Sequence, residues 1–235
     1  MRCLIALLVL GIAAPAGGLV TKELAPPPPG ATLPVVITRT LKPSNLQPGQ
    51  PVSGELIQIV PVSENIDLPR GTKLEGHIVD VSHSSVSILF DRLSWKEHTI
   101  PVHVRLIAAA GMMSVSDTKV PLSAPDRGTS NPGDYTTRQV GGDQIFLQGW
   151  SGTVYDRYSQ PVGYANYTGV YANPSQPGGL PRALGPFSTT AAGLHGLPEL
   201  SIASAGGAGV PIKLAASEPR WIIRNGSAML LEVVH

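Results

Sequence analysis

The most regular pattern in the chain is a series of short apolar segments between residues 31 and 110. From Ile100 to Leu106, apolar residues alternate with polar residues or proline, which is the period of two expected of a strand with one buried face. Turn residues such as Pro69-Arg70-Gly71 separate the segments. The pattern predicts an all-β fold, a barrel or sandwich-like barrel, with its core at 31–110. The strands are expected at Leu33–Thr38, Val52–Val60, Lys73–Val81, Val86–Leu93 and Thr99–Ile107.

The C-terminal segment, residues 218–235, has the pattern of a β-hairpin. Two apolar runs, Trp221–Ile223 and Ala228–Leu231, flank Asn225-Gly226, a dipeptide preferred in two-residue type I′ turns. An open sheet edge invites aggregation. We therefore expect this hairpin to pair with a strand of the 31–110 core and to close its sheet.

Residues 111–217 differ in composition from the regions on either side. Ser123–Gly142 and Asn173–Gly185 are rich in Gly, Pro, Ser, Thr and Asn, as long surface loops are. Leu200–Ala203 and Val210–Leu214 have the length and composition of short strands. We expect a long, loop-rich insertion with short strands between the core and the C-terminal hairpin.

Aromatic side chains gather in the middle of this insertion, where five of the six tyrosines lie with one tryptophan. One interpretation is a small hairpin whose aromatic residues pack on the barrel wall or cap its mouth. The other is an exposed surface that binds an envelope protein or a glycan, since Tyr offers a large contact area and a hydroxyl at low entropic cost. The candidate partner-binding residues are Trp150, Tyr155, Tyr158, Tyr164, Tyr167 and Tyr171.

The N-terminus has the parts of a secretory signal peptide. Arg2 precedes an apolar run that ends at Ala14, and Ala14-Pro15-Ala16 matches a cleavage site. We expect residues 1–16 to be removed on export and residues 17–30 to form a proline-rich linker. The mature chain is then periplasmic or extracellular and has no transmembrane span. The single cysteine, Cys3, leaves with the signal peptide, which excludes disulfides and thiol chemistry.

The charge of the chain is small and balanced. Seventeen Lys and Arg residues face sixteen Asp and Glu residues, for a formal net charge of +1. Charged residues make up 14% of the chain, against about 25% in ordinary soluble domains. A surface that grips a phosphate backbone needs clustered cations, so we expect no nucleic-acid partner.

The sequence carries no motif that points to catalysis. It contains no nucleophile elbow, no His-Glu-x-x-His and no phosphate-binding loop. Four histidines lie close together in the core segment, at His77, His83, His98 and His103. His98 and His103 have opposite strand parity, so their side chains are expected on different faces. We therefore predict no metal site, no cofactor and no catalytic residue.

Several core motifs resemble a known family. Leu68–Gly76, followed by Ile88–Leu93 and Ile100–Val102, is similar to the TrbI-like periplasmic β-barrel of conjugation and type IV secretion channels. Gly226–Val233 resembles the closing strand of that family. The resemblance implies a β-barrel in the cell envelope. The chain differs from the family in its cleavable signal and in a Gly- and Pro-rich region where the family has a helical hairpin.

A second resemblance links Gly141–Ile145 and Gly226–Leu231 to uncharacterised secreted bacterial proteins, and it implies no activity. Together the patterns predict an exported cell-envelope β-barrel module that is non-catalytic and binds or braces a partner. The alternative is a secreted carbohydrate-active or other hydrolytic enzyme, which needs two carboxylates or a Ser-His pair converging in a cleft. An outer-membrane barrel is disfavoured, because the turn-rich residues 123–142 could not face lipid.

Overall fold

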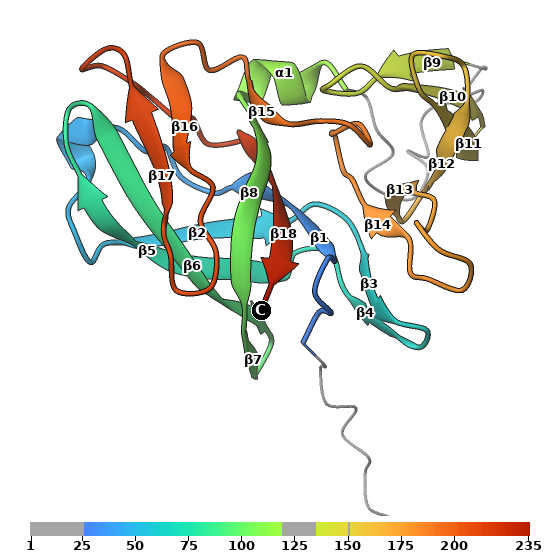
Figure 1. Ribbon diagram of the computed structural model, residues 1–235, viewed down its shortest axis with the longest axis horizontal. Helices are drawn as coiled ribbons and strands as arrows, with labels where there is room; N and C mark the ends of the chain where they lie inside the picture. The colour runs from blue at the N-terminus through green and yellow to red at the C-terminus, as the bar shows by residue number, and fades with distance from the viewer. Residues whose placement is uncertain (1–25, 119–134, 150) are drawn as a thin grey trace, which may run out of the picture.

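The computed structural model describes residues 26–118, 135–149 and 151–235 (Figure 1). The fold is nearly all β, with 54% strand and 4% helix, which confirms the predicted all-β class. The expected signal peptide, residues 1–16, lies outside the described residues, as does the linker up to residue 25. Within the described ranges, no helix has the length and hydropathy needed to cross a membrane.

A sheet of ten strands forms the main body of the protein. Its order is β15-β8-β18-β1-β2-β5-β6-β17-β16, with β7 paired to β6. The contact of β15 with β8 is parallel, whereas the other ladders of this sheet are antiparallel. The strands are β1 (Thr32–Ile37), β2 (Pro51–Leu56), β5 (Lys73–Val81), β6 (Ser85–Trp95), β7 (His98–Pro101), β8 (His103–Ala110), β15 (Gly193–His195), β16 (Leu200–Ser204), β17 (Ile212–Ala216) and β18 (Ala228–Val234).

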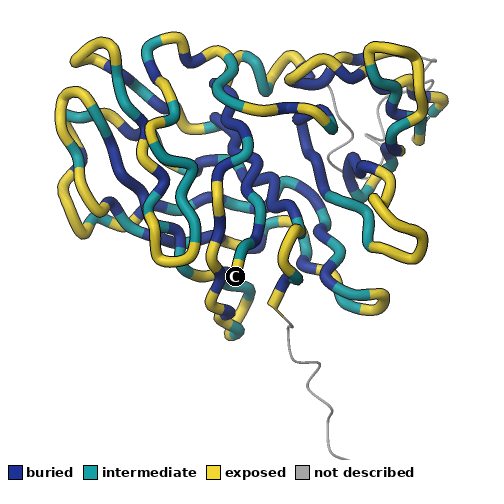
Figure 2. Tube along the Cα trace, viewed as in Figure 1, coloured by how far each residue is buried: buried dark blue, intermediate teal, exposed yellow. Residues whose placement is uncertain are grey.

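Side-chain alternation explains why these segments form strands around one core. Leu74 and Ile78 of β5 are buried, as are Val104 and Leu106 of β8. The alternate residues of β8, His103 and Arg105, face solvent. The inward side chains join in one apolar cluster, where the trace is dark blue in the centre and left of Figure 2. Burial of one large apolar side chain contributes about 1.5–3 kcal/mol, so this cluster is the main source of stability.

The two ends of the large sheet approach each other. After β16, the carbonyl of Ala205 accepts a hydrogen bond of 2.7 Å from the N–H of Leu106 in β8. The next residue, Gly206, forms an isolated bridge with Arg105. The described strands do not form a closed barrel, and the arrangement fits the sandwich-like form of the predicted class.

The C-terminal segment enters the large sheet as a single strand rather than as a hairpin. β18 lies between β1 and β8 and pairs antiparallel with both, so the expected pairing with the 31–110 core is confirmed. Ile223, on the other side of the turn, exchanges backbone hydrogen bonds of 2.8 and 2.9 Å with Leu41. Both edges of β18 are therefore occupied, and the expected hairpin between Trp221–Ile223 and this strand is not formed.

The turn before β18 also differs from the expected type I′ turn. The N–H of Ser227 donates a hydrogen bond of 3.0 Å to the carbonyl of Arg224, which closes a four-residue turn. Of its two central residues, only Gly226 has a positive φ, of 88°. A type II turn needs a positive φ at its third residue alone, whereas type I′ needs it at both central residues. The preference of Asn-Gly for a turn is thus met, but by a turn that leads the chain into β18 between β1 and β8.

The insertion supplies a second sheet of six strands, which lies at the upper right of Figure 1. Its order is β14-β13-β12-β11-β10-β9. Residues 193–216 supply β15, β16 and β17 of the large sheet, so the part that leaves the core is shorter than the 111–217 expected from composition. The strands of this small sheet are β9 (Tyr135–Arg138), β10 (Gln144–Gln148), β11 (Ser151–Tyr155), β12 (Pro161–Asn166), β13 (Gly169–Ala172) and β14 (Arg182–Ala183). The remaining described elements are the ladder of β3 (Val60–Ser63) with β4 (Ile66–Leu68), the 3-10 helix η1 (Pro43–Asn45) and the helix α1 (Met112–Ser116).

Gln58, between β2 and β3, joins the small sheet to the large one. Its side chain is only 2% exposed. Its Oε1 accepts hydrogen bonds from the N–H groups of Val170 (3.0 Å) and Gly185 (2.8 Å), and its Nε2 donates to the carbonyl of Val170 (3.0 Å). The Thr32 hydroxyl in β1 adds a bond of 2.7 Å to the carbonyl of Ala183. These buried polar bonds hold the small sheet at a defined position beside the large one.

Candidate functional site

One face of the small sheet carries a row of side chains that crosses five strands. Thr136 lies opposite Phe146, Phe146 opposite Thr153, Thr153 opposite Tyr164, and Tyr164 opposite Tyr171. Side chains of directly opposed residues stand on the same face of a sheet. Phe146 is 41% exposed and Tyr164 is 38% exposed, so the middle of this row is open to solvent.

The opposite face of the small sheet is its core. Ile145 and Leu147 of β10, Val154 of β11 and Ala165 of β12 are buried there in a cluster with Val170. This apolar cluster fixes the register of the strands, because a slip of one residue would turn it towards solvent. The aromatic row therefore stands on a sheet whose other face is held in a buried apolar cluster.

Residues around the row form a hollow of about 530 Å³. Its lining combines aromatic rings with amide and hydroxyl groups, and it contains no Asp, Glu, Lys, Arg or His among the described residues. The side chains come from β10, β11 and β12. The lining residues are Phe146, Gln148, Ser151, Gly152, Thr153, Tyr155, Tyr164, Ala165 and Asn166.

Tyr171 holds Tyr164 in position from the neighbouring strand. The two rings are stacked, with centroids 5.2 Å apart and planes 27° apart. Tyr171 is buried, and its hydroxyl donates a hydrogen bond of 2.9 Å to the carbonyl of Ile59. Burial raises the pKa of Tyr171 to about 12, although a hydrogen bond with Thr168 acts in the opposite direction. Burial also raises the pKa of Tyr164.

The structure separates the tyrosines that the sequence grouped together. Tyr155 and Tyr164 line the hollow, and Tyr171 supports it from below as a buried residue. Tyr158 and Tyr167 are 74% and 62% exposed, and they lie in the β11–β12 and β12–β13 turns, outside the lining. Trp150, the sixth candidate, lies outside the described residues.

Of the residues that line the hollow, only Tyr155 and Tyr164 were candidates from the sequence; Phe146, Gln148 and Asn166 are among those it missed. Phe146 and Gln148 stand at the outward positions of the alternating segment from Gln144 to Gln148. Asn166 ends β12, and its Oδ1 accepts a hydrogen bond of 2.9 Å from the N–H of Thr168. An aromatic residue at an outward position of an alternating strand was the signal available for Phe146.

The four histidines of the core segment do not come together. The Nδ1 of His77 lies 3.5 Å from the Oδ2 of Asp91. His83 lies in the β5–β6 turn, while His98 begins β7 and His103 begins β8. In the part of the chain that the structure describes, no group of three or more His, Cys, Asp or Glu side chains is placed to hold a metal ion.

The buried phenol of Tyr171 gives a direct test of this geometry. The pKa of tyrosine in an unfolded chain is about 10. The folded pKa of about 12 is higher, so the stabilisation it contributes is complete below about pH 10 and is lost as the pH rises through about 12. Ultraviolet absorbance of tyrosinate should show a late-ionising group that Tyr171→Phe removes. Ionisation of Tyr171 at about pH 10, as in an unfolded chain, would contradict its burial.

Comparison of the chain with family models, with curated proteins and with solved structures finds no match. The resemblance of the core motifs to the TrbI-like barrel therefore stays a prediction.

Proposed function

We propose that this chain is an exported cell-envelope protein that binds a neutral glycan, without chemical conversion, in the hollow of the small sheet. The observation that carries the proposal is the ordered row of Phe146, Thr153 and Tyr164 on an exposed face, with amides and hydroxyls around it. Export, to the periplasm or to the outside of the cell, is supported by the signal-like residues 1–16.

The chemistry of the hollow favours a sugar over other ligands. A pyranose ring has a face of C–H groups and a rim of hydroxyls. The Phe146 and Tyr164 rings offer apolar area to such a face, while Gln148, Ser151 and Asn166 carry groups that both donate and accept hydrogen bonds. The described part of the lining has no cation for a phosphate or a carboxylate, which disfavours nucleic acids and acidic polysaccharides.

The face is also rigid before any ligand arrives. β10, β11 and β12 are paired on both sides, and the Tyr171 hydroxyl bonded to Ile59 fixes the ring against which Tyr164 stacks. A side chain that is already held in place loses little conformational entropy on binding. Rigidity of this kind suits recognition by shape.

The competing proposal, a secreted hydrolase, has less support at this hollow. No carboxyl or imidazole group belongs to its described lining. Asp143 is buried and accepts hydrogen bonds from the N–H (2.8 Å) and the hydroxyl (2.6 Å) of Thr189. Asp156 accepts bonds from the N–H groups of Tyr158 and Gln160 in the turn after β11. Both carboxylates are thus used in local structure, which supports binding over acid–base catalysis.

Titration calorimetry with a panel of neutral oligosaccharides tests the proposal. We expect at least one of them to bind the purified chain, and we expect Tyr164→Ala and Phe146→Ala each to weaken that binding about tenfold or more, since loss of a central aromatic contact costs about 1–3 kcal/mol. The matched controls are Tyr158→Ala and Tyr167→Ala, which remove exposed tyrosines outside the hollow and should leave affinity unchanged.

Two results would overturn the proposal. One is a complete lack of binding to the panel by a chain that melts cooperatively. The other is binding that depends on Tyr158 or Tyr167 as strongly as on Tyr164. A protein that bound the same face in place of every glycan, and lost affinity on Tyr164→Ala, would show a protein-docking surface instead.

A further inference from the structure

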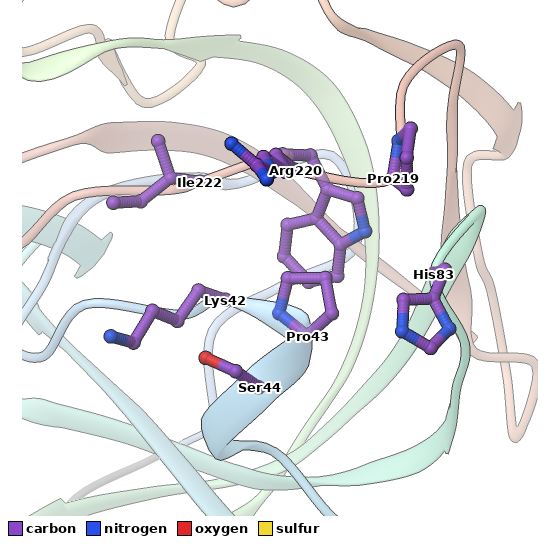
Figure 3. A pocket seen from close by; sticks show the side chains of 8 residues that line it. Lys42, Pro43, Ser44, His83, Pro219, Arg220 and Ile222 are labelled. Atoms are coloured by element: carbon purple, nitrogen blue, oxygen red, sulfur yellow. The ribbon is translucent and has the colours of Figure 1, made fainter.

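A second pocket lies between η1, the β5–β6 turn and the segment before β18 (Figure 3). The β5–β6 turn lies at the left of Figure 1, away from the small sheet at the right. Its volume is about 440 Å³. Three segments far apart in the sequence meet there: Lys42 and Pro43 at the start of η1, His83 in the β5–β6 turn, and Pro219–Trp221 before β18. The tertiary fold therefore builds this pocket, and no local motif could have revealed it.

The charge of the pocket has one sign. Lys42, Arg220 and His83 belong to its lining, and no Asp or Glu among the described residues does. Figure 3 shows the Lys42 and Arg220 side chains on one side of the pocket and the His83 ring on the other. Lys42 and Arg220, the two cations, take part in none of the ion pairs of the described residues. Unpaired cations around a concave surface concentrate the potential that attracts an anion.

The wall of the pocket also holds a donor without an acceptor. Trp221 lines the pocket and is fully buried, and its indole Nε1 has no hydrogen-bond partner among the described residues. More than about nine in ten buried polar groups in proteins are paired, so such an N–H needs an explanation. An acceptor oxygen brought in by a ligand would supply the missing partner.

The rest of the wall is apolar. Pro43 and Pro219 carry no backbone N–H and offer apolar ring surfaces to a ligand, while the buried indole of Trp221 forms the base of the wall. The volume exceeds what a simple inorganic ion needs. These features together match a ligand with an anionic head and an apolar body.

We propose that this pocket binds a small organic anion. Its carboxylate or phosphate group lies near Lys42 and Arg220, and its apolar body packs against Pro43, Pro219 and Trp221. An oxygen of the ligand accepts the indole N–H of Trp221. The site is separate from the glycan hollow, and neither proposal depends on the other.

Two aromatic anions serve as probes for the purified full chain. Phenyl phosphate and benzoate, which have the same ring and different heads, are titrated by calorimetry and by tryptophan fluorescence. Benzyl alcohol is the uncharged comparison, and inorganic phosphate is the comparison without a ring. We expect the preferred aromatic anion to bind at least tenfold more tightly than either comparison, and its affinity to fall as salt is added.

Substitutions assign the binding to this pocket. Lys42→Gln and Arg220→Gln should each weaken the preferred anion several-fold, whereas Arg70→Gln and Lys213→Gln, which change exposed cations outside the pocket, should not. Trp221→Phe removes the N–H and keeps an aromatic ring. It also leaves a cavity in the core, so the melting temperature should fall. At a temperature where the variant is still folded, we expect weaker anion binding than in the unaltered chain, whereas a purely structural Trp221 would leave the anion affinity of the folded protein unchanged.

The experiment gives different results for a carboxylate and a phosphate head group, and it separates the anion proposal from the glycan proposal. A preference for phenyl phosphate or for benzoate identifies the head group, and either result supports the proposal. Three results would overturn it. Benzyl alcohol could bind as tightly as the anions, or neither anion could bind at millimolar concentration. The third is an anion affinity that Lys42→Gln and Arg220→Gln leave unaltered. Tyr164→Ala should leave the anion affinity unchanged, so failure of the glycan proposal would be seen separately.

Discussion

Truncation of the chain after Arg220 is expected to unfold the large sheet. β18 lies between β1 and β8, so its removal breaks both ladders in the middle of the sheet. The truncation also deletes buried apolar side chains, among them Trp221, Ile223, Met229 and Leu231. Each contributes about 1.5–3 kcal/mol by burial, so the four together contribute about 6–12 kcal/mol, which is comparable to a typical total stability of about 5–15 kcal/mol.

Circular dichroism and a thermal melt of the truncated chain measure this effect. We expect loss of the sheet signal and of the cooperative transition. A chain that ends at Val234 is the control, since it lacks only the exposed His235 and keeps every β18 pairing. A truncated chain that keeps a cooperative melt would mean that the strands of 31–110 form a stable unit without β18.

Strand positions could be predicted because they depend on local alternation. The expected segment Lys73–Val81 coincides with β5, and Thr99–Ile107 covers most of β7 and β8. The break between these two strands comes at Val102, next to Pro101, which has no N–H to give to a ladder. Burial on one face and exposure on the other are visible in the sequence wherever the period of two holds.

Strand partners could not be predicted in the same way. The Asn225-Gly226 dipeptide predicted a hairpin from local preference, but β18 gains more from pairing with β1 and β8 on its two edges than from a single two-residue turn. Leu200–Ala203 was assigned to the insertion by its neighbours in the sequence, yet β16 joins the large sheet through β17. Long-range pairing decides both cases.

The candidate site, like the fold, could be predicted from the sequence only in part. The concentration of tyrosines in residues 150–171 pointed to the small sheet, but cross-strand register decides which of them share a face. Tyr171 is held inward by a hydrogen bond from its hydroxyl to the carbonyl of Ile59, a residue more than a hundred positions earlier in the chain. Phe146 joins the row through its alignment with Thr136 and Thr153 on the neighbouring strands. The pocket around Trp221 requires three distant segments, so it follows from the tertiary fold alone.

Replacement of Gln58 by leucine is expected to release the small sheet from the large one. Gln58→Leu keeps a similar volume but leaves two buried N–H groups, of Val170 and Gly185, without their present partner, while the carbonyl of Val170 keeps its bond from the N–H of Leu184. A buried polar group that loses its partner costs about 1–3 kcal/mol. Gly169 packs so closely on the Gln58 side chain that an added Cβ would lie 2.5 Å from its Cδ, so the region has no room to rearrange around a branched side chain. We expect a total loss of about 3–5 kcal/mol.

Hydrogen exchange followed by mass spectrometry locates this loss. Amides of 135–149 and 151–183 should exchange much faster in Gln58→Leu, while β5 and β6 keep most of their protection, and the melting temperature should fall by about 10 °C. Gln144→Leu is the matched control, because it makes the same change at an exposed position of β10, where an effect below about 0.5 kcal/mol is expected. Because Tyr171 is bonded to Ile59 across the same contact, its phenol should also ionise earlier in Gln58→Leu than in the unaltered chain. Equal loss of protection in both sheets would instead mean that the two sheets unfold as one cooperative unit.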